Sequence, residues 1–561
     1  MNIIGRFNKY LIAILALALV LRIVGLSEFP VGFTQDEAGL GYDAYSILKT
    51  GKDMWGETLP LTLRSFGDYK LPLYSYLAIP SVSIFGLSEF AVRLPGAIFG
   101  TLAILACYLM VKKLTENENL AIYSALFLAL SPWHVSLSRG AFEANLTTFF
   151  IPLGVWSFLE GMKNSKMMTA AAILFGLNLF TYHPARIFTP LIVAALVFIN
   201  KKQFFEDLAK YKLSVFIFLF FLGVALFTAF WGGAATRGAD LAIFNPTDNW
   251  ASVSDRRYEG VMEGLPNWAS RIFSNKVTYV LRTFTHNYLT YVSPGFLFIQ
   301  GAGEWTYGMI SGRGVLYLFE IILLIAAIVA IVKRQSFKGV DFILVWLILA
   351  PIPAALTKGS GYAANRVTVI LPAILILSAY GLVYLQGVLK DKFRNFNIGK
   401  YLVPGVIFVL ILSFIGFAED YLYHAPPKGA EAMKYGMGEA VSYINENQAK
   451  YDQIVVSRSL GVPHIWVAFY GKLDPKLVQD ASLKWAEQQQ ESGVVYTDQL
   501  GSYRLGKYVF GDINLEDIVR TGKKSLVMGR PWEFKENMNI VKTVNYPNQV
   551  PLVLIVDPSV K

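Results

Sequence analysis

Thr34-Gln35-Asp36-Glu37-Ala38 places two carboxylates next to each other just after the first hydrophobic segment of the chain. Charged side chains are rare so close to a bilayer unless they have a function. Thr34 and Glu37 have the spacing of a capping box, in which each side chain bonds the backbone of the other at a helix start. The stretch predicts a helix that begins here, with one face suited to lie along a membrane surface: Ala38, Tyr42, Tyr45 and Leu48.

The composition is that of an integral membrane protein. Of 561 residues, 54% are hydrophobic and 16% are charged, and the mean hydropathy is +0.44, whereas soluble domains carry about 25% charged residues. The formal net charge is +10, but the Lys and Arg residues lie in short loops between apolar runs. That distribution is typical of topology signals and of contact with anionic lipid, so we expect membrane lipid as a partner and no nucleic acid.

About eleven apolar runs are candidates to cross a bilayer, which takes about 20 residues each. The basic loops between them, including those at Arg6 and 390–400, all fall on one side, which the positive-inside rule makes cytoplasmic. We therefore expect a multi-pass protein of the plasma membrane with a cytoplasmic N-terminus and external loops at 27–89 and 232–312. The expected spans are 8–26, 90–111, 119–137, 144–160, 167–183, 186–200, 213–231, 314–332, 341–357, 366–387 and 401–418.

The tail at 419–561 is a different kind of sequence, with mixed polarity and ordinary charge density. Runs typical of strands, such as Ile454-Val455-Val456, alternate with stretches typical of helices, such as 436–447. We expect a small α/β domain outside the membrane, following a transmembrane domain at 1–418.

Polar side chains from separate spans gather at one depth, on the external side. Charges at helix ends either reach toward water or converge on a shared cavity. The first explanation suits one or two residues but not several carboxylates and cations together, so we expect a shared pocket. Its candidate residues are Asp36, Glu37, Asp68, Lys70, Arg93, His134, Arg139, Glu143, Tyr182, His183, Arg186 and Arg366.

Each candidate has a structural interpretation beside the functional one. The capping box does not need Asp36, and the helix dipole favours its ionised form, which suits a general base; Glu37 is either a cap or a supporting acid. Lys70 either anchors an apolar segment at the interface or places a charge on a phosphate. The arginines either anchor helix ends or bind phosphate oxygens, and Arg139 is also spaced to pair with Glu143.

The histidines do not have metal-binding spacing. No HxxxH or HExxH pattern occurs among the five histidines, so His134 and His183 are expected to form hydrogen bonds. We expect no metal or other cofactor, and leave open a divalent ion held by Asp36 and Glu37 with a distant ligand.

Several short motifs, in order, resemble the membrane C-type glycosyltransferases of the protein O-mannosyltransferase and aminoarabinose-transferase kind (glycosyltransferase family 39 and relatives). The resemblance covers about residues 5–390. The matching strings are Asp36-Glu37, Lys-Leu-Pro-Leu-Tyr at 70–74, Val-Arg-Leu-Pro at 92–95, Ser-Pro-Trp-His at 131–134, Ser138-Arg139, Tyr-His-Pro-Ala-Arg at 182–186, the stretch 287–298 and Ala364-Asn365-Arg366.

The resemblance implies a GT-C fold and transfer of a monosaccharide from a polyprenyl-phosphate donor to a hydroxyl outside the cytoplasm. It implies that Asp36 acts as the base with Glu37 in support. It also implies that four cations hold the lipid phosphate: Lys70, Arg93, Arg139 and Arg186. Inversion at the sugar would follow by analogy with inverting glycosidases.

The acceptor stays open. Aminoarabinose transferases carry a Lys-Pro-Pro motif where this chain has Lys70-Leu71-Pro72, so lipid A is not implied. No MIR-type domain is visible at 232–312, so a protein acceptor is not implied either. Two other classes compete with the enzyme. The first is a transporter or flippase of lipid-linked glycans, a class that tends to show internal repeats and charges at the membrane midplane. The second is a non-catalytic scaffold that displays the tail, and it does not explain the Asp36 loop.

Overall fold

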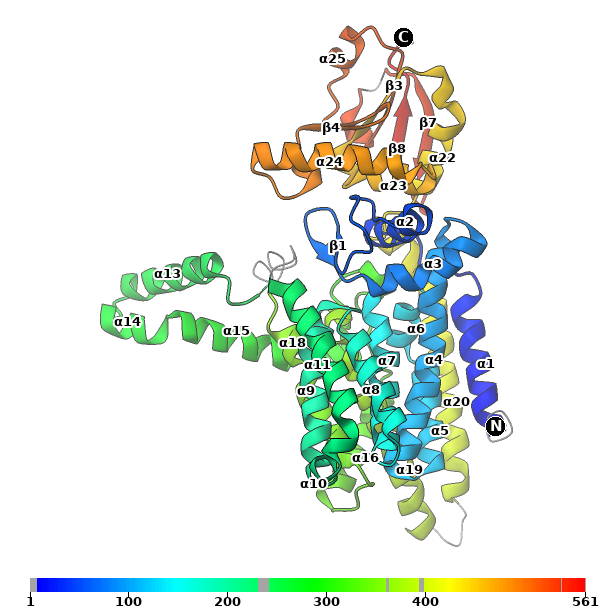
Figure 1. Cartoon of the computed structure of the whole chain (residues 1–561), viewed down its shortest axis with the longest axis vertical. Coiled ribbons are helices and arrows are strands. Elements are labelled where there is room, and N and C mark those ends of the chain that lie inside the picture. The colour runs from blue at the N-terminus through cyan, green and yellow to red at the C-terminus, as the bar shows by residue number, and fades with distance from the viewer. Residues whose placement is uncertain (1–7, 231–241, 360–362, 393–397, 536, 560–561) are drawn as a thin grey trace.

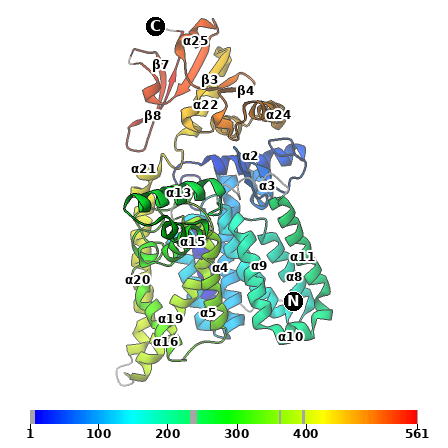
Figure 2. The same cartoon turned by 90° about the vertical axis from the view of Figure 1, so that its left-hand side faces the viewer.

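The computed structural model describes residues 8–230, 242–359, 363–392, 398–535 and 537–559. Arg6 and part of the basic loop at 390–400, both used to predict topology, lie outside these ranges, as does the start of the predicted loop at 232–312. A long bundle of helices forms one part of the molecule, and a mixed sheet with its own helices forms the other (Figure 1). The helix that begins at Gln35 lies between them (Figures 1 and 2).

Every predicted span overlaps a helix of the bundle. Four described segments are long and apolar enough to cross a membrane, or up to five if the bent pair Glu118–Leu130 and Pro132–Ser138 counts as one span. The count of eleven therefore stays a prediction. The bundle helices are α1 (Lys9–Ile23), α4 (Glu89–Thr115), α5 (Glu118–Leu130), α6 (Pro132–Ser138), α7 (Thr147–Gly161), α8 (Ser165–Asn178), α9 (His183–Ile199), α10 (Lys201–Glu206), α11 (Leu208–Phe230), α16 (Glu320–Val332), α17 (Val340–Leu349), α18 (Ile352–Ala355), α19 (Leu371–Lys392) and α20 (Ile398–Glu419).

Helix α2 (Gln35–Thr50) begins as the sequence predicts. Thr34 and Glu37 form a reciprocal capping box, and Gly51 ends the helix in the left-handed conformation with φ of 71°. The prediction that Ala38 and Tyr42 lie along a membrane surface is wrong. Both are fully buried in a hydrophobic cluster that includes the C-terminal region, and the Tyr42 hydroxyl donates to the Leu473 carbonyl at 2.9 Å.

A short antiparallel hairpin and one more helix follow α2 in the chain. Strands β1 (Leu63–Arg64) and β2 (Tyr69–Lys70) pair Leu63 with Lys70, and α3 (Leu73–Phe85) follows. The Phe66 carbonyl in the hairpin turn accepts from the Thr497 amide at 3.0 Å. The C-terminal region therefore holds the hairpin as well as α2.

The C-terminal region contains a six-stranded sheet in the order β4-β5-β3-β6-β8-β7. Strand β3 is central and parallel to both neighbours, whereas the outer pairs are antiparallel. The mixed α/β character predicted for the tail is confirmed. Its elements are α21 (Ala425–Gly429), α22 (Met437–Asn447), β3 (Gln453–Ser457), α23 (Pro463–Tyr470), α24 (Pro475–Ser492), β4 (Ser502–Leu505), β5 (Tyr508–Gly511), α25 (Leu515–Arg520), β6 (Ser525–Gly529), β7 (Ile540–Asn545) and β8 (Pro551–Val556).

The two largest hydrophobic clusters of the described residues do not follow the domain boundary at 418/419 that the sequence predicts. One fills the helical bundle. The other joins α2 and α3 to the C-terminal region, with Ile47 and Trp55 in the same cluster as Phe469 and Trp485. Helix α2 is therefore fixed by residues more than 400 positions away, and whatever it carries has a rigid base.

Candidate functional site

An ion pair between Asp36 and Lys70 lies where α2 and β2 meet. The Lys70 Nζ is 2.7 Å from the Asp36 Oδ1, and the side chains are 8% and 38% exposed. Asp36 lies in the first turn of α2, where the helix dipole favours a negative charge. The pair therefore combines an accessible carboxylate with a sheltered cation, both predicted from the sequence.

Lys70 keeps its charge despite its burial. Burial alone lowers the pKa of this ammonium, but Asp36, Glu143 and Asp68 act in the opposite direction and raise it above its usual value. The predicted pocket residues Asp68 and Glu143 therefore belong to the electrostatic surroundings of Lys70. Lys70 is therefore a cation held among carboxylates, and an anionic group that binds it has to compete with Asp36.

Glu37 has different partners from Asp36. It accepts from the Arg93 Nε at 2.9 Å, with both side chains fully enclosed, and from the Ala141 amide at 3.0 Å. Arg93 also donates to backbone carbonyls of the segment before α2: those of Leu26, Pro30 and Gly32. This geometry favours a structural role for Arg93, because its guanidinium is surrounded by acceptors from its own chain.

Arg139 holds the same segment from the other side. Its guanidinium donates to the carbonyls of Leu21, Val24, Gly25 and Phe29. The turn that carries it packs closely on α4, since a Cβ added to Gly96 would be 2.4 Å from the Gly140 carbonyl oxygen. Arg93 and Arg139 together fix the path of the chain into α2 rather than presenting charge to a ligand.

His134 forms hydrogen bonds, as its sequence context predicts. It is fully buried, with Nδ1 2.9 Å from Arg22 Nη2 and Nε2 3.1 Å from Thr148 Oγ1. The sequence analysis did not select Arg22, although an arginine inside the first apolar run is itself a signal of a specific partner. Both residues lie in the packed interior.

Predicted residues at the start of α9 and in the turn before it contact the segments around Lys70. The His183 ring Nε2 is 2.9 Å from the Tyr69 carbonyl, directly beside Lys70. The Leu73 amide donates to the Phe180 carbonyl at 3.2 Å, and Asn365 donates to the Tyr182 hydroxyl at 3.0 Å. These contacts join α9 and the 364–366 segment to the hairpin.

Arg186 and Arg366 have partners elsewhere. Arg186 donates to Thr228 on α11 at 2.8 Å, and Arg366 donates to Thr357 at 3.1 Å and to the Lys358 carbonyl. Of the four cations predicted to hold one phosphate, Arg93 and Arg139 thus contact the segment before α2, whereas Arg186 and Lys70 contact other parts of the chain. Lys70 is the one that stands beside the exposed carboxylate Asp36.

The sequence analysis missed a buried acidic pair behind the site. Asp43 and Asp53 are 4% and 0% exposed. Asp43 accepts from the Met54 amide at 3.0 Å, and Asp53 accepts from the amides of Trp55 and Glu57 at 2.9 Å each. Burial raises the pKa of both carboxyls, that of Asp53 to about 6. The signal was the spacing of Asp43, seven residues after Asp36 on the same helix face.

No metal centre is evident in the described ranges, where no three His, Cys, Asp or Glu side chains come together to hold an ion. A divalent ion held by Asp36 and Glu37 with a distant ligand stays an open prediction.

The fold is a helical GT-C fold like that of ArnT. The chain superposes on ArnT from Cupriavidus metallidurans bound to undecaprenyl phosphate with a TM-score of 0.56, covering 97% of this chain and 98% of that one at 13% identity. The apo structure of the same enzyme gives a TM-score of 0.54 with 97% of each chain covered, also at 13% identity. Identity this low shows the shared fold alone.

Sequence comparison finds similarity over part of the chain. Residues 70–227 match the family described as dolichyl-phosphate-mannose-protein mannosyltransferase. A protein of Aquifex aeolicus (strain VF5) that carries no assigned function is 26% identical over 165 residues, or 27% of this chain and 32% of that relative. The chain thus aligns with about a third of that protein's length. The resemblance to membrane C-type glycosyltransferases that the motifs predicted is confirmed.

Proposed function

We propose that this protein transfers a monosaccharide, a hexose or a pentose, from a polyprenyl-phosphate donor to an acceptor hydroxyl outside the cytoplasm. The Asp36–Lys70 ion pair carries the proposal, because its carboxylate and its ammonium, 2.7 Å apart, have the chemistry that a base and a phosphate-binding cation need. The family match supports it, since that match begins at Lys70. The acceptor is a glycan, a lipid or a protein.

The two residues divide the chemistry between them. Asp36 takes the proton from the acceptor hydroxyl while the oxygen of that hydroxyl forms a bond to the anomeric carbon. The bond from that carbon to the phosphate oxygen breaks, and polyprenyl phosphate leaves with the electron pair. Lys70 stabilises the negative charge that develops on this leaving group. Attack opposite the leaving group inverts the anomeric centre.

The ion pair also explains how the donor prepares the base. Before donor arrives, Lys70 is paired with Asp36. A donor phosphate competes for Lys70, which frees the Asp36 carboxylate to contact the acceptor hydroxyl. The partial exposure of Asp36 leaves room for the acceptor.

The proposed orientation follows from the same reaction. Nucleotide sugars are absent outside the cytoplasm, so the activated sugar arrives on a lipid. In this arrangement α2, the Asp36–Lys70 pair and the C-terminal region face outward, and the N-terminus is cytoplasmic. The distribution of Lys and Arg among the loops supports this orientation.

The test is transfer of label from radiolabelled polyprenyl-phosphate-sugar in membranes that contain the full chain. The Asp36→Asn variant should lose transfer and release of polyprenyl phosphate, whereas Glu28→Gln, which removes an exposed carboxylate from the same segment, should keep both. Wild-type transfer by Asp36→Asn would refute the base assignment. Movement of intact donor across the membrane without release of polyprenyl phosphate would identify a transporter instead.

A further inference from the structure

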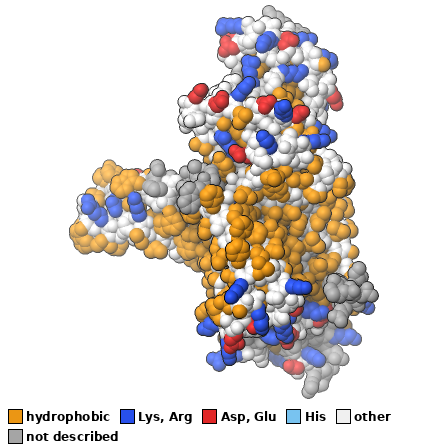
Figure 3. All heavy atoms as spheres, in the orientation of Figure 1, with side chains coloured by type: hydrophobic (Ala, Val, Ile, Leu, Met, Phe, Trp, Pro, Cys, Tyr) orange, Lys and Arg blue, Asp and Glu red, His pale blue; other side chains and the backbone are white. Residues whose placement is uncertain are grey.

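A helical hairpin extends sideways from the bundle at the end that carries α2 (Figure 1). It consists of α13 (Pro246–Met262), α14 (Asn267–Phe273) and α15 (Lys276–Tyr291). The space-filling view shows hydrophobic side chains over the bundle and again along this hairpin (Figure 3). The hairpin therefore projects over the region where a bilayer around the bundle would have its surface.

The hairpin exposes large apolar side chains that a soluble surface would not carry. Trp250 is 60% exposed, Trp268 69% and Phe273 68%. Val277 and Leu281 on α15 are similarly exposed and lie four residues apart, on one face of that helix. Patches of this kind mark contact with a partner or a membrane, and Trp is enriched where membrane meets water. Beside a membrane-spanning bundle, the bilayer surface fits this face.

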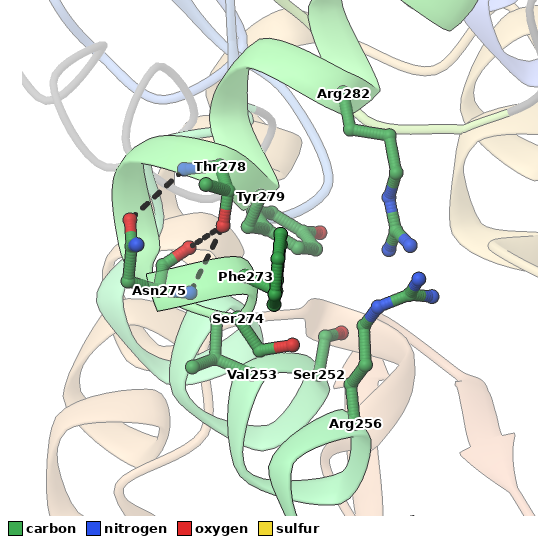
Figure 4. Close-up of a pocket in the computed structure, with 9 residues that line it drawn as sticks. All are labelled: Ser252, Val253, Arg256, Phe273, Ser274, Asn275, Thr278, Tyr279 and Arg282. Atoms are coloured by element: carbon green, nitrogen blue, oxygen red, sulfur yellow. Dashed lines mark hydrogen bonds between the residues drawn. The ribbon is translucent and has the colours of Figure 1, made fainter. Parts of the chain in front are cut away.

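A cavity of about 210 Å³ opens between α13 and α15. The side chains of Arg256 and Arg282 reach toward each other across it (Figure 4). Ser252, Ser274 and Tyr279 add hydroxyl groups to the lining. Two guanidinium groups that face one another repel, so an anion placed between them would be stabilised by both.

Neither arginine has a protein partner in the described residues, where no hydrogen bond or ion pair involves Arg256 or Arg282. The hairpin carboxylates whose side chains the structure describes are Asp255, Glu259 and Glu263, beside five Lys or Arg residues, and none of the three pairs with either cavity arginine. Arg257, one position along, donates to the Ser274 carbonyl at 2.6 Å. The contrast with this bonded neighbour indicates that the two cavity arginines are available to a ligand.

We propose that this hairpin is a membrane-interface anchor whose cavity binds the phosphate of an anionic phospholipid. Arg256 and Arg282 bind the phosphate oxygens, the nearby hydroxyls donate to the headgroup, and Phe273, Val277 and Leu281 contact the acyl region. The apolar face distinguishes a phospholipid from a free anion, because inorganic phosphate would leave that face in water. The proposal is independent of the transferase reaction, since it uses none of the residues at the Asp36–Lys70 pair.

Native mass spectrometry of the full chain released from mixed phosphatidylglycerol and phosphatidylcholine tests the cavity. The Arg256→Gln/Arg282→Gln variant should retain phosphatidylglycerol at least about tenfold more weakly than wild type, because both guanidinium groups that bind its phosphate are removed. Arg271→Gln/Lys276→Gln makes the same charge change on the same hairpin outside the cavity and should retain more than half of the wild-type binding. An equal loss in both variants, or no loss in either, would overturn the proposal.

Two competitor arms identify the source of the phosphate. Inorganic phosphate alone, at a concentration equal to that of the lipid, should not displace phosphatidylglycerol, and polyprenyl phosphate should not bind in preference to it. Displacement by inorganic phosphate would make this a free-anion site. Preference for polyprenyl phosphate that is lost in Arg256→Gln/Arg282→Gln would make it a donor site. Either result overturns the phospholipid assignment.

Depth measurement tests the anchor. A spin label at Ile272→Cys, in a Cys107→Ala background, should be more accessible to oxygen than to a water-soluble nickel reagent in phospholipid nanodiscs. A label at the exposed Lys484→Cys on α24 should show the reverse. If the two labels give the same accessibility, the hairpin does not enter the interface and the proposal fails.

Discussion

Glu37 and Arg93 form a fully enclosed ion pair, with Arg93 Nε 2.9 Å from Glu37 Oε1 and neither side chain exposed. The pair links the first turn of α2 to α4, a helix long enough to span the membrane. The same carboxylate caps α2 and accepts the Ala141 amide. The position of Asp36, one residue earlier, therefore depends on this buried contact.

We expect Glu37→Gln to destabilise the protein strongly. Glutamine can still accept the capping bond, but it leaves the Arg93 charge buried without a counter-ion, which costs about 3–5 kcal/mol. The midpoint of thermal unfolding of the detergent-solubilised protein measures the effect. Asp68→Asn, which changes a carboxylate near Lys70, is the matched control and should unfold near the wild-type midpoint. Equal midpoints for Glu37→Gln and wild type would show that the pair does not hold α2.

We expect Lys70→Gln to reduce transfer about 100-fold to 1,000-fold, the range seen when one group that stabilises developing negative charge is removed. Lys70→Arg should recover part of the loss, because it restores the charge with a different shape. Single-turnover kinetics with labelled donor measures both. A loss confined to the apparent affinity for acceptor would contradict the role of Lys70 at the phosphate.

The pH dependence of transfer should show no loss from Lys70 below about pH 10. Burial works against the ammonium, but Asp36, Glu143 and Asp68 outweigh it and raise the pKa of Lys70, so deprotonation moves to higher pH. A pH–rate profile of wild type beside Lys70→Arg measures this, since arginine stays protonated throughout. If wild type falls between pH 8 and pH 10 while Lys70→Arg does not, Lys70 titrates in that range and the expectation is wrong.

We expect Asp53→Asn to stabilise the protein at pH 7.5 and to do so less at pH 4.5. Burial raises the pKa of Asp53 to about 6, so the folded state favours the protonated carboxyl. Ionisation of Asp53 therefore costs stability above about pH 6, and the cost disappears as pH falls toward the ordinary value near 4. Thermal unfolding of both proteins at the two pH values measures the difference. A difference between variant and wild type that grows on acidification would contradict the sign.

Gly41→Val should displace α2 from both of its supports. A Cβ at Gly41 would be 2.4 Å from a Val92 methyl on α4 and 2.9 Å from the Phe469 ring on α23. Such overpacking costs about 1–3 kcal/mol, and we expect transfer activity to fall with the unfolding midpoint. Gly501→Val is the control, because a Cβ there meets open space. Full activity and stability in Gly41→Val would show that the contact is not required.

The sequence predicted the local elements well where they depend on neighbouring residues. The Thr34–Glu37 capping box is present, and Ile454-Val455-Val456 lies within β3. Motif order also led to the correct fold family. The number of membrane-spanning helices was harder to predict, because several helices of the bundle are shorter than a bilayer crossing or are bent.

The partners of the charged residues could not be predicted from the sequence. Asp36 and Glu37 are adjacent, yet one contacts Lys70 and the other Arg93. Consecutive side chains on a helix point about 100° apart, so neighbours in sequence face different surroundings. In the structure, the residues of the predicted cation cluster form one partly exposed ion pair and several buried contacts with other segments.

By itself the amino-acid sequence determined that this is a membrane protein, that a helix starts at Thr34 with two acids, and that the chain resembles GT-C transferases. Those properties depend on composition and on contacts a few residues apart. Only the tertiary structure decided that Asp36 forms an ion pair with Lys70, that Glu37 forms a buried ion pair with Arg93, and that the C-terminal region packs on α2. These depend on packing between distant segments, where shape and burial select one partner among many of the same charge.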